Sequence, residues 1–571
     1  MSIPTKSQPG SARLRVAVML DDVDAPQWIH DLIKQLENSQ RVDLSAIIIA
    51  NFNKSADWSM RETILRSWIR LNKLAFQRLG DPLNKVAATY SVPTILAKPE
   101  PGTGRLRDET TGDILAKNLD LIVQLGSSAV PQSLARCARL GIWNFRYEGY
   151  NTPDTEVALF WMLLNGSRTC ELVLEPQLAG RTKLGPLYRC TFRVHPLSLY
   201  LNLILDSVRR RQILMRCLRS FAEGRCYSTN NTESSAPDSA LAEPSPAAMV
   251  RYIPWWFGTS LRHMFRKVWF REKWFIGYSK THITGVEDSD PHQFNVLWPP
   301  GRFNYADPFL FRVKDSSYLF FEKWQWGHKG SIFCVEIDSN GNASKPREVL
   351  ARDYHLSYPF VFEWQGEFYL LPESSDNRTI DVYRAVEFPW RWQFASTLIS
   401  NTTAVDPTIV EYNGKLWLFV SGFAPGPETN ETELSIFYAD SLFGEWTPHP
   451  KNPVVRDVRS ARSAGRIFYH DGKLIRPGQD CSEYYGFAIS LNRIDVLTET
   501  DYREHTVSTI RPDWIPDICA THNLDQKPGL IAIDAKVRTP VWRLLRNNRE
   551  PKIPGPEKSA AVFARLSRYS A

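Results

Sequence analysis

The chain has 571 residues, 43% hydrophobic and 23% charged, a globular composition with room for roughly two to four domains. Its net charge of +7 is small for this length, and it has no zinc-finger spacing or basic block, which argues against nucleic acid as a partner. Aromatic residues make up 12%, with 19 Trp, which favours large β cores and sugar-stacking surfaces.

The eight cysteines are scattered and none forms a CxxC pair, so we predict free thiols and no metal site. The N-terminal segment has only a short apolar run before Asp21 and Asp22, which is too short for a signal peptide. No run approaches the roughly 20 apolar residues of a membrane span. We therefore expect a cytoplasmic protein.

Residues 13–215 are predicted to form an α/β domain. The segments Leu14–Leu20, Leu44–Ala50 and Leu119–Gly126 are continuous apolar runs, and helical patterns such as "APQWIHDLIKQLEN" lie between them. Continuous rather than alternating apolarity indicates strands buried on both faces, as in a parallel sheet. The region therefore predicts a layered domain of the Rossmann type.

A linker is predicted over residues 216–250, which include a stretch rich in Ser, Pro, Asn and Ala. The next segment, 251–284, is basic and aromatic. Its apolar residues on one helical face are Leu261, Phe265, Val268 and Trp269. Two interpretations stay open: a helix that docks one domain onto the other, or peripheral contact of residues 251–275 with an anionic membrane.

Residues 285–545 are predicted to be a five-bladed β-propeller, followed by a tail at 546–571. The segments "EWQGEFYLLPE", "EYNGKLWLFVS" and "YHDGKLIRPGQ" share one hairpin frame, and "KDSSYLFFEK" and "QKPGLIAIDAK" are weaker copies. A unit of roughly 50 residues with about four strands cannot bury its faces alone, whereas several packed radially can. A β-sandwich is the alternative, but it does not explain the shared frame.

The repeat carries Asp-Pro at the start of two apolar strands, in "YADPFLF" and "AVDPTIV". Asp307 and Asp406 occupy the same repeat position, and Tyr358 lies there in the second copy. Since the first strands of propeller blades line the central channel, we expect the two carboxylates to meet at one mouth. The alternative is that Asp-Pro is turn chemistry alone.

Further polar residues accompany these acids at the ends of the repeated strands. Glu373 ends a second strand, at a position that we align with Lys323, Ser421 and Gln479. The predicted substrate-binding residues are Tyr358, Arg462, Asp480, Glu483, Tyr484 and His522. Acids and aromatic rings suit a polyhydroxylated ligand, and two carboxylates flanking a glycosidic bond serve as acid and base or as acid and nucleophile.

Residues from about 285 to 540 resemble the N-terminal propeller domain of glucosamine inositolphosphorylceramide transferases. The segments that carry the resemblance are "ADPFLF", "VDPTIVEYNGKLWLF" and "RSAGRIFYHDGKLIRPGQDCSEYYGFAISLNRI". That domain is similar in fold to five-bladed glycoside hydrolases, which implies Asp307 as the base and Asp406 or Glu373 as an acid or auxiliary group. In the plant transferases sugar transfer belongs to a separate module, so the resemblance also allows a propeller that binds glycan without catalysis.

Residues 14–205 resemble folate-dependent formyltransferases in "DLIVQLGSSAVPQSLARCARLGIWNFRYEGYNTPD". Asn144 matches the family's Asn-x-His motif, whereas Arg146 stands where that motif has His, and no clear counterpart of the family's Asp follows. Formyl transfer needs an acid–base pair beside the carbonyl, so these departures argue against a folate cofactor and predict a remnant site.

Three functions follow as hypotheses. The first is a glycosyl transferase or glycosidase-like enzyme that makes or modifies a surface glycan or glycolipid at the propeller mouth. The second is a non-catalytic glycan-binding scaffold. The third is an acyl or formyl transferase that acts on an amino sugar with its N-terminal domain.

Overall fold

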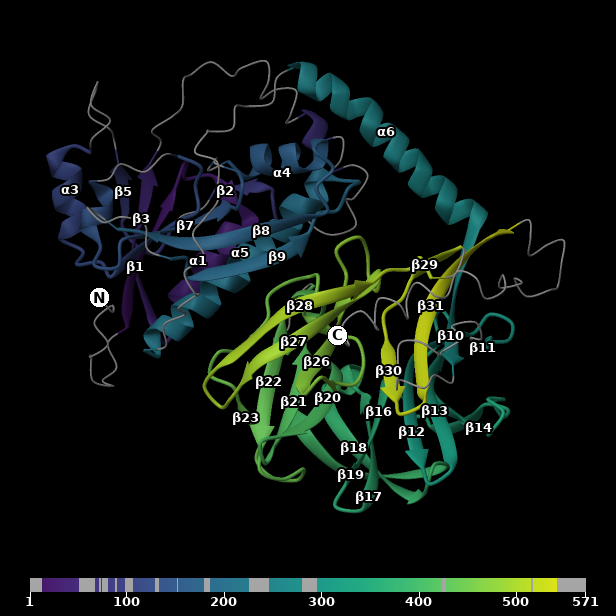
Figure 1. Cartoon of the computed structure of the whole chain (residues 1–571). Helices are drawn as coiled ribbons and strands as arrows, with labels where there is room; N and C mark the ends of the chain where they lie inside the picture. The colour runs from purple at the N-terminus through teal and green to yellow at the C-terminus, as the bar shows by residue number, and fades with distance from the viewer. Residues whose placement is uncertain are drawn as a thin grey trace. The chain divides into compact units, whose positions relative to one another are not determined.

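The structure is a computed structural model of the whole chain (Figure 1). It describes residues 13–50, 67–70, 73, 81–87, 90–97, 106–128, 133–150, 152, 154–178, 185–224, 246–279, 295–423, 428–514 and 517–541. The chain divides into two compact units, Met1–Leu261 and Arg262–Ala571, and each is described by itself.

The first unit is built on a seven-stranded sheet in the order β5-β3-β1-β6-β7-β8-β9. The strands are β1 (Leu14–Leu20), β3 (Val42–Ala50), β5 (Thr94–Ala97), β6 (Leu121–Gln124), β7 (Ile142–Tyr147), β8 (Thr169–Gln177) and β9 (Tyr188–Arg193). Pairing is parallel from β5 to β7 and antiparallel from β7 to β9. A separate pair joins β2 (Ala25–Pro26) to β4 (Lys85–Val86).

Helices cover both faces of this sheet. They are α1 (Gln27–Glu37), α3 (Asp108–Leu115), α4 (Thr155–Leu164) and α5 (Leu199–Ala222), with a 3-10 turn at Leu134–Cys137. Within β1, Val16 and Val18 pack into one core and Ala17 and Met19 into the other. The predicted layered α/β domain with its parallel sheet is therefore confirmed, whereas the formyltransferase-like fold stays a prediction.

The predicted linker 216–250 overlaps two helices at its ends. Helix α5 continues to Ala222, and helix α6 (Pro246–Trp269) begins before residue 250. Residues 225–245 and the predicted tail 546–571 lie outside the described residues. In the part of the chain that the structure describes, no helix is long and apolar enough to cross a membrane.

The second unit is a five-bladed β-propeller, as the repeat predicts (Figure 1). Blade one holds β12 (Asn304–Val313), β13 (Ser316–Trp324), β14 (Ser331–Ile337) and β15 (Arg347–Leu350). Blade two holds β16 (Ser357–Trp364), β17 (Glu367–Glu373), β18 (Thr379–Glu387) and β19 (Arg391–Ser400), with a 3-10 turn at Ser375–Asn377. Blade three holds β20 (Val405–Tyr412), β21 (Lys415–Ser421), β22 (Leu434–Ala439) and β23 (Thr447–Pro448), with the short helix α7 (Thr429–Thr432). Blade four holds β24 (Arg462–Ser463), β25 (Phe468–His470), β26 (Lys473–Asp480), β27 (Ala488–Leu497) and β28 (Tyr502–Ile510).

The fifth blade joins the two ends of this unit. Its strands are β10 (Phe270–Ser279), β11 (Asn295–Leu297), β29 (Ile518–Ala520), β30 (Leu524–Lys527) and β31 (Leu530–Pro540), and β10 pairs with β31 along its whole length. The propeller therefore begins at Phe270, upstream of the predicted boundary at residue 285. Repeat spacing could not reveal this, because β10 precedes the first copy of the repeat.

The predicted hairpin frame is confirmed by the backbone of its turns. Gln365-Gly366, Asn413-Gly414 and Asp471-Gly472 have φ values of 52° and 78°, 51° and 75°, and 47° and 71°. Positive φ at both central residues defines the two-residue turn whose twist matches that of the flanking strands. These turns set the register that brings the starts of the first strands to one mouth of the propeller.

Candidate functional site

Three first strands, β12, β16 and β20, carry a bulge at the same repeat position. The bulged residues are Asp307, Tyr358 and Asp406, with φ values of 53°, 46° and 53°, and each precedes a proline. Left-handed backbone is costly for a residue other than glycine and persists where the surroundings enforce it, often at functional sites. The Asp-Pro repeat thus marks a β-bulge. The bulge interrupts the hydrogen bonds between the strands and changes the direction of the side chain that precedes the proline.

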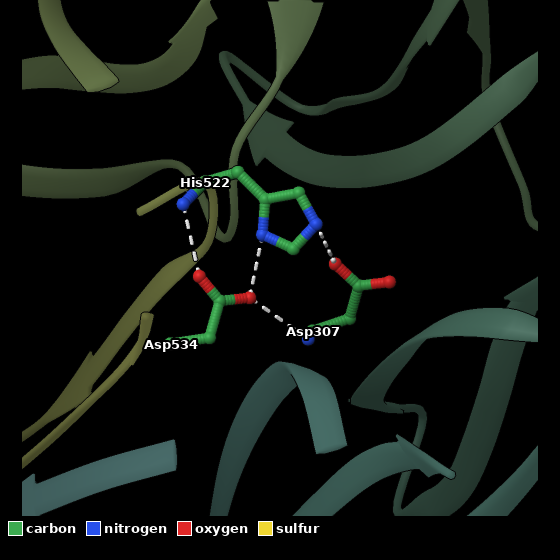
Figure 2. Close-up of side chains that lie close together, drawn as sticks. All are labelled: Asp307, His522 and Asp534. Carbon is green, nitrogen blue, oxygen red and sulfur yellow. Dashed lines mark hydrogen bonds and ion pairs between the residues drawn. The ribbon is translucent and has the colours of Figure 1, made fainter. Parts of the chain in front are cut away.

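Asp307 faces an imidazole that is held by a second carboxylate (Figure 2). His522 Nε2 lies 3.7 Å from Asp307 Oδ1, and His522 Nδ1 lies 2.6 Å from Asp534 Oδ2. The carboxylate of Asp534 is fully buried and accepts hydrogen bonds from the backbone N–H groups of Asp307, His522 and Asn523. Asp534 therefore holds both the imidazole of His522 and the backbone of the bulge in place. Because Asp534 contacts Nδ1, the other ring nitrogen, Nε2, faces Asp307.

The surroundings of the first cluster raise the pKa of both Asp307 and His522. Burial raises the pKa of Asp307 to about 7; His522 opposes this rise, and Glu322 and Asp534 add to it. Burial disfavours the charged form of His522, but the carboxylates of Asp534 and Asp307 outweigh burial and raise its pKa. A carboxyl group with a pKa near the working pH is suited to giving and taking a proton.

Asp406 belongs to a second cluster with one cation and two acids. Arg462 Nε donates to Asp406 Oδ2 at 2.7 Å, and a terminal nitrogen of the same guanidinium lies 3.9 Å from Glu373 Oε2. Burial raises the pKa of Asp406 well above its usual value; Arg462 opposes this rise and Glu373 adds to it. One guanidinium therefore faces two buried carboxyl groups and offsets part of the negative charge that they place in this cluster.

An exposed ring covers both clusters. Tyr485 is 38% exposed, its ring centre lies 4.9 Å from the Arg462 guanidinium carbon, and it meets the His522 ring edge-on at 5.6 Å. Asp307 is only 7% exposed and Asp406 only 2%. The predicted gathering of carboxylates is thus present, but Asp307 and Asp406 are nearly closed off from solvent, and Tyr485 is an exposed side chain that contacts both clusters.

Tyr358, predicted to bind substrate, is wholly buried. Its hydroxyl accepts a hydrogen bond from Gly465 N at 2.9 Å and lies 2.8 Å from the Thr408 hydroxyl. The side chain therefore ties three blades together, and the structure gives it no surface for a ligand.

Three more predicted ligand residues lie where β26 leads into the loop before β27: Asp480 ends β26, and Glu483 and Tyr484 lie in the loop. Asp480 accepts a hydrogen bond from Ser482 N, and burial raises its pKa. The Tyr484 hydroxyl donates to the carbonyl of Cys519, and Glu483 is half-buried beside it. Asp480 and Tyr484 thus make their described hydrogen bonds away from Asp307 and Asp406, and Tyr485 is the loop residue that contacts both clusters.

The first blade contains an acid that the sequence alignment of repeats missed. Strand register makes Glu322, not Lys323, the equivalent of Glu373, so the predicted alignment is wrong by one residue. The error arose because Asp315 replaces the glycine that marks the turn in the clearer copies. His355 Nε2 lies 3.2 Å from Glu322 Oε1, and a backbone N–H donates to its Nδ1, so the imidazole presents Nε2–H to the acid.

The first unit has a cavity of about 450 Å³ at the carboxyl ends of β1 and β6. Asn144 and Arg146, the predicted remnant site, both line it, and Asn144 Oδ1 is buried without a hydrogen-bond partner among the described residues. Arg146 is held by Glu175 at 2.8 Å and Glu148 at 3.0 Å. The strand order reverses between β1 and β6, which is where open α/β sheets bind ligands.

Comparison with known proteins identifies relatives of the propeller. Residues 299–513 match the family model described as "Glucosamine inositolphosphorylceramide transferase 1, N-terminal", which confirms the predicted resemblance. The glucosamine inositolphosphorylceramide transferase 1 of Arabidopsis thaliana is 40% identical over 203 residues, 35% of this chain and 26% of the relative. The protein of that name from Oryza sativa subsp. japonica is 38% identical over 207 residues, 36% of this chain and 28% of the relative. The chain thus spans about a quarter of the length of these relatives.

Solved structures similar to this chain include glycoside hydrolases. Zg3597, a family 117 glycoside hydrolase from Zobellia galactanivorans, is 13% identical with a TM-score of 0.32 and covers 51% of this chain and 98% of its own. The alpha-L-arabinanase of Cellvibrio cellulosa complexed with arabinohexaose is 12% identical with a TM-score of 0.28 and covers 35% of this chain and 77% of its own.

Proposed function

We propose that the propeller is a carbohydrate-active site that makes or modifies a surface glycan or glycolipid. The observation that carries the proposal is Asp307, a buried carboxyl group whose pKa is raised to about 7 and which faces His522 and lies near a second acid pair. Cleaving or forming a glycosidic bond requires one group that donates or accepts a proton. It also requires a second group that acts as a base or stabilises the positive charge that develops on the sugar. The two clusters offer both.

The roles follow from the partners of each acid. Asp307 is the proposed proton donor and acceptor, and Asp534 is a positioning residue that acts through His522. Asp406 and Glu373 form the second acid pair, with Arg462 limiting their combined charge. Tyr485, exposed and in contact with both clusters, is the proposed stacking surface for a sugar ring.

The substrate class comes from the relatives of the propeller. Their name contains glucosamine and inositolphosphorylceramide, an amino sugar and a phosphate-linked lipid. We infer that this chain acts on a sugar carried by a lipid of similar chemistry. The chain spans about a quarter of the length of those relatives. Sugar transfer by this chain is therefore part of our proposal and is not inferred from the activity of the relatives.

Turnover by the full chain tests the proposal. Mass spectrometry would follow sugar nucleotides incubated with inositolphosphorylceramide acceptors, and aryl glycosides would report hydrolysis. Asp307→Asn is expected to abolish turnover. The matched control is Asp495→Asn, because Asp495 is an exposed aspartate of β27 that pairs with Arg493 and His505. Ligand binding without turnover by the unaltered chain would favour the non-catalytic scaffold, and full activity of Asp307→Asn would refute the role of that acid.

A second candidate function concerns the first unit. Asn144 lines the cavity with a buried oxygen that lacks a partner among the described residues, which favours a bound ligand there. The chemistry would be acyl or formyl transfer to an amino sugar, although Arg146 in place of His argues against folate. This function predicts an acylated amino sugar whose formation is lost in Asn144→Ala and retained in Asp307→Asn.

A further inference from the structure

Helix α6 exposes an apolar stripe near its C-terminal end. Its earlier residues Ala248 and Tyr252 are buried in the core of the first unit. Six later side chains are each at least half exposed: Phe257, Leu261, Met264, Phe265, Val268 and Trp269. At about 100° per residue these six fall within an arc of about 140°, so they form one continuous face.

Positive charge borders this stripe, and no acid lies near it along the helix. The segment from Pro246 to Arg271 contains no Asp or Glu. Arg262 and Arg266 flank one edge of the stripe and Lys267 the other, and all three are exposed. The first acid beyond the helix, Glu272, is paired with Lys536 at 3.1 Å and with Arg538 at 2.8 Å.

We propose that this face of α6 binds an anionic lipid surface. A lipid interface accepts an apolar stripe among its acyl chains and cations among its phosphates at once, which matches a stripe with cationic borders. An acid-free border offers no complementary pairing to the mixed charges of an ordinary protein surface. Helix α6 is not apolar enough to cross a membrane, so the proposed contact places it along the surface of the bilayer.

The helix leads directly into the propeller site. Trp269 ends α6, the next residue begins β10, and Trp274 stacks on His522 with ring centres 4.2 Å apart. Five residues of strand span about 17 Å. Binding through the end of α6 would therefore hold the acids of the propeller within reach of a lipid-linked sugar, a consequence that rests on the proposed function.

Vesicle sedimentation of the full chain tests the binding. The protein should sediment at low salt with vesicles of phosphatidylcholine and phosphatidylserine, and remain in solution with phosphatidylcholine alone. Phe265→Asp should lower the partition coefficient at least tenfold. The change removes an apolar side chain from the interface and adds a negative charge, which the anionic lipid repels. Phe394→Asp is the matched control, since Phe394 is 51% exposed on a blade and Phe265 52%.

The charges are tested separately. Replacing Arg262, Arg266 and Lys267 by Gln should lower the partition coefficient on the order of 100-fold at low salt and abolish most of its salt dependence. The control replaces three exposed cations of the blades, Lys345, Arg384 and Arg391. Equal losses in this control, or no sedimentation of the unaltered chain at low salt, would overturn the proposal.

Two further outcomes decide what covers the stripe. If Phe265→Asp dissociates an oligomer in the absence of lipid, a second copy of the chain occupies the face and the lipid proposal is wrong. Turnover of a soluble acceptor without acyl chains should be unchanged in Phe265→Asp and lost in Asp307→Asn. The membrane proposal and the proposed function therefore fail independently.

Discussion

Asp307→Asn is expected to stabilise the propeller at alkaline pH while removing the proposed acid–base group. The folded pKa of Asp307 is about 7 against an ordinary value of 3.8, so the folded chain binds the proton more tightly than the unfolded chain. Stability from this group is complete below the lower pKa and is lost as pH rises through the upper one. This difference in pKa corresponds to a loss of about 4 kcal/mol in the free energy of unfolding above neutral pH. Of this loss, about 2–3 kcal/mol occurs between about pH 5 and about pH 8.

Asparagine fits this position without new strain. The φ of residue 307 is 53°, and Asn tolerates left-handed backbone better than most residues. An amide oxygen can still accept the hydrogen bond that Tyr358 N donates to Asp307 Oδ2 at 3.2 Å. The variant therefore loses the cost of burying a charge and keeps the local contacts.

Urea unfolding at about pH 5 and about pH 8 measures this difference, and hydrogen exchange of peptides from β12 assigns the transition to the propeller. Wild type should lose stability between the two pH values, and Asp307→Asn should lose about 2 kcal/mol less. Asp353→Asn serves as the control, because Asp353 is exposed between β15 and β16. Equal pH dependence in wild type and Asp307→Asn would show that Asp307 ionises normally, and the acid–base argument would fail.

Three further variants probe the frame around the acids. Arg462→Met should destabilise the propeller by about 3–5 kcal/mol, because it leaves buried carboxyl groups without their cation, and adding Asp406→Asn should restore part of this loss in urea unfolding. Gly465→Ala should prevent folding or cost more than about 3 kcal/mol, because φ is 128° and a Cβ would lie 1.8 Å from a backbone carbonyl; a soluble chain with a normal melting temperature would contradict this. Gly486→Ala places a Cβ 2.9 Å from His522 Cβ at φ of 67°, so it should lower turnover and shift its pH profile, and an unchanged profile would count against the role of His522.

The fold of the propeller was predictable because each repeat has recognisable turn residues and strand patterns in its local sequence. Turns such as Asn413-Gly414 mark each hairpin, and the apolar strands that flank them keep one spacing. The meeting of Asp307 and Asp406 at one mouth followed from repeat position alone. The first blade shows the limit, since Asp315 in place of glycine shifted the inferred register and hid Glu322.

Residues that depend on blade closure were not predictable. Asp534 lies in "LIAIDAK", where an acid within an apolar strand was the available signal of a buried, hydrogen-bonded charge. Its partner Asp307 lies in β12 and its partner His522 lies between β29 and β30, and Trp274, which stacks on His522, comes from β10, which precedes the repeat. The contacts of Asp307 with Asp534 and of Trp274 with His522 join residues more than two hundred positions apart, and no local pattern records them.

The same backbone position gives the two acids different chemistry because the blades beside them differ. In the bulge of β16, between these two, the repeat places Tyr358 instead of a carboxylate, and its hydroxyl forms hydrogen bonds with Gly465 and Thr408. Asp406 faces a guanidinium, which cannot release its proton in a protein. Asp307 faces the imidazole of His522, a side chain that can itself bind and release a proton in a protein. In the proposed reaction, proton exchange therefore belongs to Asp307 and His522, and Arg462 supplies a fixed positive charge beside Asp406.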